Sequence, residues 1–82
     1  MAAVVIIRYW AGARAAAGCA EERMEVATIG ELVSALTPRD GLARVLGASS
    51  LLIDGATARV DDAGRRLPAG SVVDVLPPFA GG

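Results

Sequence analysis

Alternating apolar residues open the chain and predict a β-strand over residues 4–10. The stretch VVIIRYW is rich in β-branched and aromatic side chains, which favour strands. Successive side chains of a strand point to opposite faces. Val5, Ile7 and Tyr9 therefore share one face, and Arg8 and Trp10 share the other. The charge of Arg8 indicates that the second face is at least partly exposed.

A short helix and a second strand are expected next. The stretch AGARAAAG, residues 11–18, is rich in alanine and ends on Gly18, which favours one or two helical turns with a glycine stop. The following stretch EERMEVA sets Arg23 and Glu25 against Met24 and Val26. This alternation predicts a charged, exposed edge strand that returns against the first strand.

The clearest helix is predicted over TIGELVSAL, residues 28–36. Thr28 and Glu31 have the spacing of a capping box. The apolar residues fall at i, i+3, i+4 and i+7 and form one stripe: Ile29, Leu32, Val33 and Leu36. Pro38 ends this helix. The stretch DGLARVLG repeats the pattern and predicts a further short helix with Gly47 as its stop.

Three more strands are predicted in the second half of the chain. SLLIDGATARV has the pattern of a strand, an Asp-Gly turn and a strand, in which Asp54 serves the turn. DDAGRRLPAG is a turn-rich loop, and SVVDVL is the last strand, which Pro77-Pro78 prevents from continuing as a central strand. Strands and helices are mixed rather than strictly alternating, so the pattern predicts one α+β domain over residues 1–82. Its sheet of about five strands would be covered on one face by a main helix.

The first and last strands create a distinctive outer face if they lie side by side. Val73 and Val75 would then point toward the helix. The outward side chains would be Arg8, Trp10, Asp74 and Leu76, with an ion pair between Arg8 and Asp74. Apolar patches of this kind often bind other proteins. The alternative interpretation is an ordinary half-covered sheet face.

Composition narrows the function classes. The chain has 82 residues, 54% of them hydrophobic, and a formal net charge of −1, which suits one domain with a real core. Its eight basic residues are all arginines, scattered among nine acidic residues, whereas nucleic-acid-binding domains usually carry a basic stripe. The apolar start is too short to span a bilayer. We therefore expect a cytoplasmic protein that binds neither nucleic acid nor membranes.

The residue types needed for most catalytic sites are missing from the sequence. It contains no histidine and one cysteine, which excludes Ser-His and Cys-His nucleophile pairs and a Cys/His zinc cluster. No glycine-rich loop has phosphate-binding spacing. We expect a chain that is not an enzyme by itself and that binds no cofactor or metal. Cys19 is interpreted as a structural or incidental thiol; a catalytic or persulfide role is the alternative.

The remaining candidate for chemistry is the stretch LPPFAGG, residues 76–82. Pro77-Pro78 would hold the chain extended and off the sheet, and Phe79 could anchor in a partner's pocket. Ala80, Gly81 and Gly82 offer almost no bulk, so a narrow channel could admit them. Six residues reach roughly 20 Å when extended, enough to carry the carboxylate of Gly82 into another protein's active site, where it would need activation, for instance as an acyl-adenylate. The alternative is a frayed terminus.

Three stretches resemble the MoaD/ThiS family of sulfur carriers, which are ubiquitin-like β-grasp proteins. These stretches are RYWAGARAAAG, LLIDG and LPPFAGG, and the resemblance spans essentially the whole chain. Its length and ending look most like the small subunit of molybdopterin synthase. The resemblance implies that an E1-like enzyme uses ATP to adenylate Gly82 and that a sulfur donor converts it to a thiocarboxylate. The large subunit of molybdopterin synthase would then receive the tail for sulfur transfer to the pterin precursor.

The resemblance also implies roles for particular residues. Gly81 and Gly82 match the functional ending of the family. Trp10 and Leu76 fall where the family places apolar partner-contact residues, whereas Phe79 is larger than the aliphatic residue often found there. Two alternatives remain: a carrier for thiamine, cysteine or another sulfur metabolite, and a β-grasp interaction module whose tail is inert.

Overall fold

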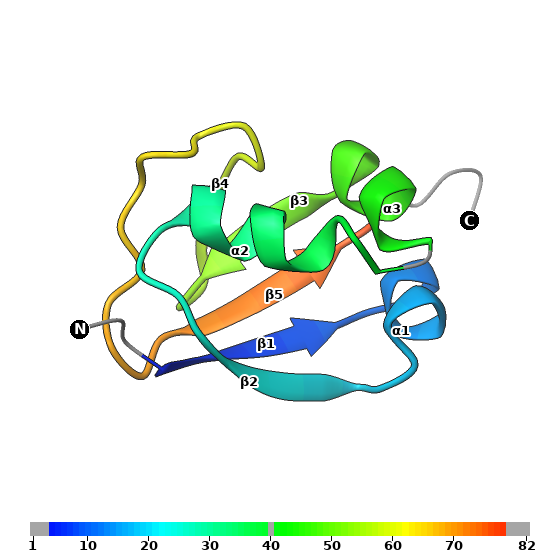
Figure 1. The fold of residues 1–82 in the computed structure, drawn as a ribbon, viewed down its shortest axis with the longest axis horizontal. Coiled ribbons are helices and arrows are strands. Elements are labelled where there is room, and N and C mark those ends of the chain that lie inside the picture. The colour runs from blue at the N-terminus through cyan, green and yellow to red at the C-terminus, as the bar shows by residue number, and fades with distance from the viewer. Residues whose placement is uncertain (1–3, 40, 79–82) are drawn as a thin grey trace.

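The computed structural model describes residues 4–39 and 41–78. Within them, five strands form one sheet with the order β2-β1-β5-β3-β4, and α2 lies across one face of it (Figure 1). The elements are β1 (Val4–Tyr9), α1 (Gly12–Ala17), β2 (Glu21–Glu25), α2 (Ile29–Leu36), α3 (Leu42–Ala48), β3 (Ser50–Ile53), β4 (Ala56–Ala58) and β5 (Val72–Leu76). The predicted α+β arrangement is confirmed.

The first and last strands lie side by side, as predicted. β1 pairs in parallel with β5, and Arg8 stands opposite Asp74 in the register. β2 pairs antiparallel with β1 and forms one edge of the sheet, and β3 pairs antiparallel with both β5 and β4. Parallel neighbours finish at the same end of a sheet, so the ends of β1 and β5 meet there.

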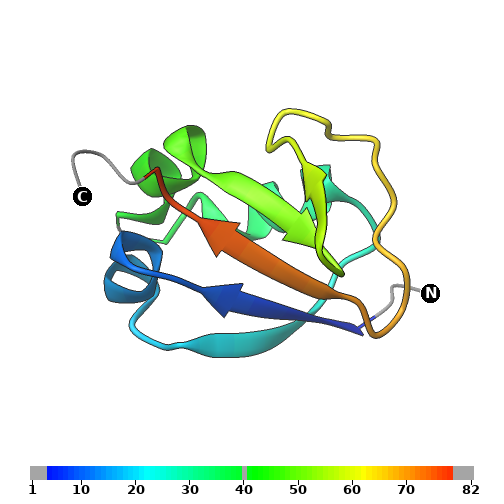
Figure 2. The ribbon, with the colours of Figure 1, turned by 180° about the vertical axis from the view of Figure 1, so that it is seen from behind.

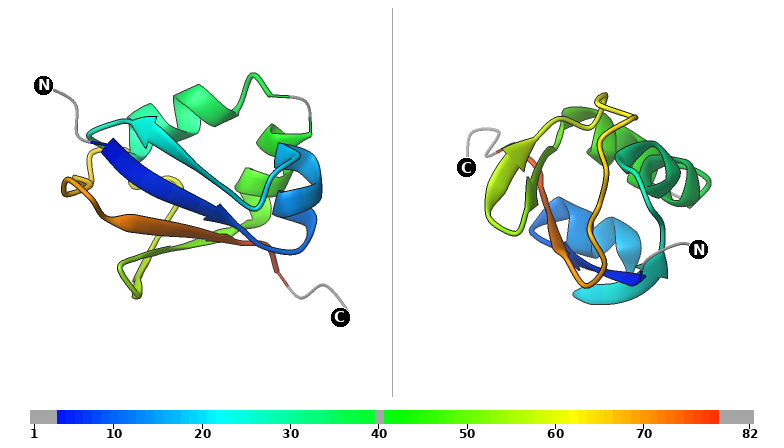
Figure 3. Two further views of the ribbon diagram at one scale, coloured as in Figure 1. Left: turned by 90° about the horizontal axis from the view of Figure 1, so that it is seen from below. Right: turned by 90° about the vertical axis from the view of Figure 1, so that its left-hand side faces the viewer.

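The two faces of the sheet have different surroundings. The predicted inward residues are at most 1% exposed: Val5, Ile7, Tyr9, Val73 and Val75. They pack against the apolar side of the helices, which Figure 3 shows as a second layer beside the sheet. Figure 2 shows the opposite face, in front of which no helix lies.

Helix α2 begins with the predicted capping interaction. The Glu31 N–H donates to the Thr28 hydroxyl oxygen at 3.2 Å. The Glu31 carboxylate accepts from the Ala27 N–H at 2.8 Å, so the return bond reaches one residue before the cap. Three of the four residues of the predicted stripe are fully buried: Ile29, Leu32 and Leu36.

The loop between β4 and β5 closes over the start of α2. The Ile29 N–H donates to the Arg65 carbonyl and the Gly30 N–H to the Ala63 carbonyl, both at 2.9 Å. A Cβ atom at Gly30 would lie 3.0 Å from the Ala63 carbonyl oxygen, so the close approach of the loop requires glycine. These bonds satisfy N–H groups that the first helical turn cannot pair internally.

One predicted helix end is wrong, whereas the predicted Asp-Gly turn is confirmed. Gly47, the predicted stop, lies inside α3. The helix continues to Ala48, after which the Ser49 hydroxyl donates to the Val45 carbonyl. Asp54 and Gly55 have φ values of +49° and +86°, as a two-residue hairpin turn requires. The Asp54 carboxylate also accepts from the Val72 N–H at 2.9 Å, which fixes the start of β5.

Helices in the described part of the chain are all short, and none has the length and apolar character needed to cross a membrane.

Candidate partner-binding site

The ends of β1 and β5 bring Arg8, Trp10 and Asp74 together on the uncovered face of the sheet. Arg8 and Asp74 are opposite one another in the register. The backbone N–H of Trp10 donates to the Val75 carbonyl at 3.3 Å, so residue 10 continues beside β5 after β1 has ended. The face count made from the sequence thus places these three side chains correctly.

The Asp74 carboxylate is the centre of this group. Its Oδ1 accepts from Arg8 Nε at 2.7 Å and from Trp10 Nε1 at 2.9 Å, and its Oδ2 accepts from Arg8 Nη2 at 3.3 Å. The predicted Arg8–Asp74 pair is confirmed and is bidentate, a geometry that adds strength and direction to an ion pair. The bond from Trp10 was not predicted.

The surroundings of Asp74 favour its charged form. Asp74 is 7% exposed, and this burial alone would raise the pKa of its carboxyl group. Hydrogen bonds from Arg8 and Trp10, together with the positive charge of Arg8, outweigh the burial and hold the pKa below its ordinary value. A carboxylate that receives several hydrogen bonds stays ionised, so Asp74 remains an acceptor at neutral pH.

Trp10 is exposed although its polar atom is engaged. The side chain is 41% exposed, and the Arg8 guanidinium lies over its ring at 5.7 Å from the centroid, within cation–π range. Ala11, which follows, has φ +49° and ψ −126°, and the Ala13 N–H donates to the Trp10 carbonyl at 3.0 Å. This turn puts a non-glycine residue in a strained conformation of the kind that gathers at functional sites.

Apolar neighbours extend the group into a surface that we call the outer patch. Val72 and Leu52 are register neighbours of Ile6 and Asp74. Four apolar side chains are partly exposed, and Trp10 is exposed. The four are Ile6, Leu52, Val72 and Leu76. The outer patch consists of Ile6, Arg8, Trp10, Leu52, Val72, Asp74 and Leu76. It is an apolar surface that contains one ion pair, between Arg8 and Asp74.

The predicted tail begins beside the outer patch. β5 ends at Leu76, and Pro77 and Pro78 follow outside any strand, as predicted. The predicted reactive group at Gly82 and the tail positions Phe79, Ala80 and Gly81 lie outside the described residues. The chain therefore leaves the sheet next to Trp10.

Sequence reasoning missed a second carboxylate cluster, on the covered side of the sheet. Glu22 Oε2 accepts from the Tyr9 hydroxyl at 2.6 Å and from Arg39 Nη1. Arg39 Nη2 also donates to the Ala17 carbonyl at 2.9 Å. The signal was present in the pattern of β2, because Glu22 falls on the same face as Met24 and opposite Ile7.

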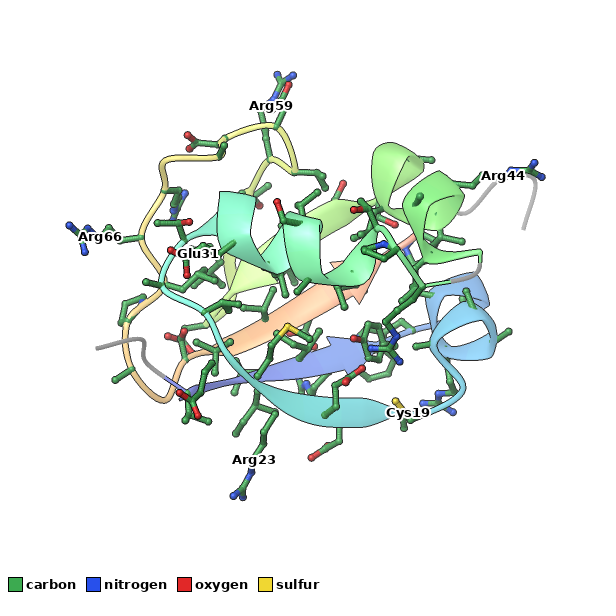
Figure 4. All side chains as sticks on the ribbon, in the orientation of Figure 1. Cys19, Arg23, Glu31, Arg44, Arg59 and Arg66 are labelled. Atoms are coloured by element: carbon green, nitrogen blue, oxygen red, sulfur yellow. The ribbon has the colours of Figure 1, made fainter. Side chains whose placement is uncertain are left out.

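Cys19 lies at the margin of this cluster, where Figure 4 places it at the start of β2 near α1. Its sulfur is 3.7 Å from Glu22 Oε2 and it is partly exposed. Cys19 is also one of the partly buried residues that pack against the core. Residues 4–39 and 41–78 contain no group of three or more His, Cys, Asp or Glu side chains that could hold a metal ion.

Comparison with known proteins supplies the family. The model of the ThiS family matches residues 7–82, while no curated protein matches the chain.

Three solved structures are similar. A chain in the complex of subunits 1 and 2 of the molybdopterin-converting factor from Helicobacter pylori is 23% identical, with 96% of this chain and 99% of that chain covered and a TM-score of 0.76. Small archaeal modifier protein 1 from Methanosarcina acetivorans is 21% identical, with 100% and 99% covered and a TM-score of 0.78. Small archaeal modifier protein 1 from Haloferax volcanii is 25% identical, with 96% and 99% covered and a TM-score of 0.76. These likenesses confirm the predicted β-grasp fold.

Proposed function

Because the chain belongs to the ThiS family, we propose that it carries sulfur for molybdenum cofactor biosynthesis on the carboxylate of Gly82. An E1-like enzyme transfers the adenylyl group of ATP to this carboxylate and releases pyrophosphate. Hydrosulfide from a sulfur donor then displaces AMP, so that a C–S bond replaces the C–O bond to the nucleotide and a thiocarboxylate results. The thiocarboxylate sulfur forms a bond to the molybdopterin precursor, and water then cleaves its bond to the acyl carbon, which returns Gly82 to the carboxylate. The observation that carries the proposal is the family match, which runs through the stretch LPPFAGG to Gly82.

The geometry supports a carrier rather than a catalyst. The outer patch lies where the chain leaves β5, so a partner bound to the patch would have its active site within reach of the tail. A span of six residues covers roughly 20 Å. Activation and transfer are the work of partners met in the cytoplasm: the adenylating enzyme, the sulfur donor and the large subunit of molybdopterin synthase. The Helicobacter pylori structure, a complex of subunits 1 and 2, supports the last of these partners.

A second candidate function is the modification of other proteins. It is favoured by the likeness to the two small archaeal modifier proteins. In that case the activated carboxylate of Gly82 is attacked by an amine of a target protein instead of by sulfur, and an amide forms. A carrier for thiamine or cysteine synthesis uses the same thiocarboxylate with a different acceptor.

Intact-mass measurement distinguishes sulfur carriage from protein modification. The chain is incubated with ATP and the adenylating enzyme of its own organism, in one arm with a sulfide source and in the other with a protein extract of that organism as a source of target amines. A carrier gains the mass of one sulfur in place of one oxygen, whereas a modifier is recovered joined to a second protein. Deletion of Gly82 should abolish both products and leave the fold intact, and Asp61→Ala, an exposed position in the loop after β4, should behave as the unaltered chain. Normal activation without Gly82 would refute the proposal.

A further inference from the structure

Trp10 is held on two sides in the free protein. Its indole N–H donates to Asp74 Oδ1 at 2.9 Å, and the Arg8 guanidinium covers its ring at 5.7 Å from the centroid. The N–H is the only polar group of a tryptophan side chain. The part of the indole that stays exposed is therefore entirely apolar, although the residue stands on the surface.

We propose that Asp74 is a positioning residue, which fixes the indole of Trp10 so that a wholly apolar pocket of the adenylating enzyme can receive it. The inference rests on the proposed function, because it describes how the outer patch meets that partner. A buried N–H without an acceptor carries a free-energy penalty. Since Asp74 supplies the acceptor from within the chain, the pocket needs none. A side chain that is ordered before binding also loses less conformational freedom on docking.

Asp74 acts through its neighbours rather than by touching the partner. It is 7% exposed, and its two oxygens accept three hydrogen bonds from Arg8 and Trp10. Its charge is balanced by Arg8, so the centre of the outer patch presents no net charge. Glu21, opposite Arg8 on β2, is exposed and belongs to the rim of the surface.

The free chain tests the positioning directly, because Trp10 is its only tryptophan. Asp74→Val removes both acceptors and keeps a residue that suits a strand. We expect the fluorescence anisotropy of Trp10 to acquire a fast local decay in this variant. Asp74→Asn keeps an oxygen acceptor and should restore most of the order. Equal indole order in the valine variant and the unaltered chain would overturn the proposal.

A matched control is available in the loop after β4. Asp61 pairs with Arg59 through two hydrogen bonds of 2.9 Å, and Figure 4 shows Arg59 extending from the loop away from the sheet. Asp61→Val removes a bidentate pair of the same two residue types, which is more exposed than the Arg8–Asp74 pair and makes no hydrogen bond to Trp10. It should leave the anisotropy unchanged.

Binding to the purified adenylating enzyme tests the consequence. Ordering one side chain is worth about three- to tenfold in affinity, so Asp74→Val should raise Kd by that factor. The same substitution should have no further effect in a Trp10→Phe background, because phenylalanine has no N–H to position. An equal loss in both backgrounds would show that Asp74 acts independently of Trp10 and would overturn the inference. Failure of the unaltered chain to bind the enzyme would instead contradict the proposed function, and the anisotropy would still decide whether Asp74 positions Trp10.

Discussion

Two carboxylates hold two consecutive aromatic residues in nearly the same way on opposite faces of the sheet. Glu22 accepts from the Tyr9 hydroxyl and from Arg39, and Asp74 accepts from the Trp10 N–H and from Arg8. The aromatic residues differ in exposure, since Tyr9 is 1% exposed and Trp10 is 41% exposed. The same chemistry therefore serves packing on one face and presentation on the other.

The two clusters also differ in what they join. Through Arg39, the Glu22 cluster connects β1 and β2 with the end of α1 and the segment after α2. The Asp74 cluster connects only the neighbouring ends of β1 and β5. We infer that damage to the first cluster lowers the stability of the fold, whereas damage to the second lowers affinity for a partner.

The largest expected effect is that of Tyr9→Ala. It removes a fully buried ring and leaves Glu22 without the hydroxyl donor. Deletion of a large buried aromatic side chain costs about 3–5 kcal/mol, a large part of the stability of a small domain. Denaturant unfolding should show this loss directly. A loss below about 1 kcal/mol would mean that the Glu22 cluster does not stabilise the fold.

Trp10→Ala should have the opposite profile. Truncation of an interface aromatic residue weakens binding by about 1–3 kcal/mol, whereas the loss of the hydrogen bond from Trp10 to Asp74 should lower stability by only about 1 kcal/mol. The affinity for the adenylating enzyme and the denaturation midpoint are measured on the same preparation. Unfolding of this variant with unchanged affinity would reverse the roles assigned to the two faces.

Glu22→Gln should alter stability in a pH-dependent way. Burial alone would raise the pKa of Glu22, but hydrogen bonds from Tyr9 and Arg39 outweigh it and leave the pKa below its ordinary value of 4.5. A carboxyl group with a lowered folded-state pKa stabilises the fold above its unfolded-state pKa, and this contribution is lost as the pH falls through the folded-state value. We expect the variant to lose roughly 1 kcal/mol at neutral pH and to show a shallower decline in stability below pH 4.5.

Asp74→Asn is the matched comparison for this experiment. The pKa of the Asp74 carboxyl group is also lowered from its ordinary value of 3.8, so any stability that the carboxylate contributes is lost as the pH falls below that value. Urea unfolding at a series of pH values separates the two carboxylates. Identical pH profiles for Glu22→Gln and the unaltered chain would contradict the assigned hydrogen-bonding role of Glu22.

The sequence predicted the Asp74 cluster better than the Glu22 cluster for a physical reason. Strand alternation and a parallel register are properties of the backbone, so counting placed Arg8 opposite Asp74. Counting cannot give the side-chain conformation that brings the Trp10 N–H to the same oxygen. The Glu22 cluster depends on Arg39, which follows α2. The position of Arg39 is set by packing among separate segments. Its one visible signal was a glutamate on the apolar face of β2.

Helix ends were predictable to the same limited extent. The Thr28 cap is local and was correctly predicted. Gly47 was wrongly taken as a stop, because glycine is compatible with a helix interior at a modest cost and the Ser49 hydroxyl bonds to the last turn instead. Local sequence signals thus predicted the strands and the main helix. The end of α3 and the Glu22 cluster depend on side-chain contacts that local signals do not reveal.

The smallest expected effect is that of Cys19→Ser. The thiol is a weak donor to Glu22 at 3.7 Å, and a serine hydroxyl can donate to the same carboxylate, so stability should change by about 0.5 kcal/mol or less. If sulfur travels only on Gly82, thiocarboxylate formation should also continue at an unchanged rate, and intact-mass measurement over time follows it. A large fall in that rate with normal stability would make Cys19 a participant in sulfur transfer. The chemistry of the chain would then lie partly in the Glu22 cluster, and the division of roles between the two faces of the sheet would no longer hold.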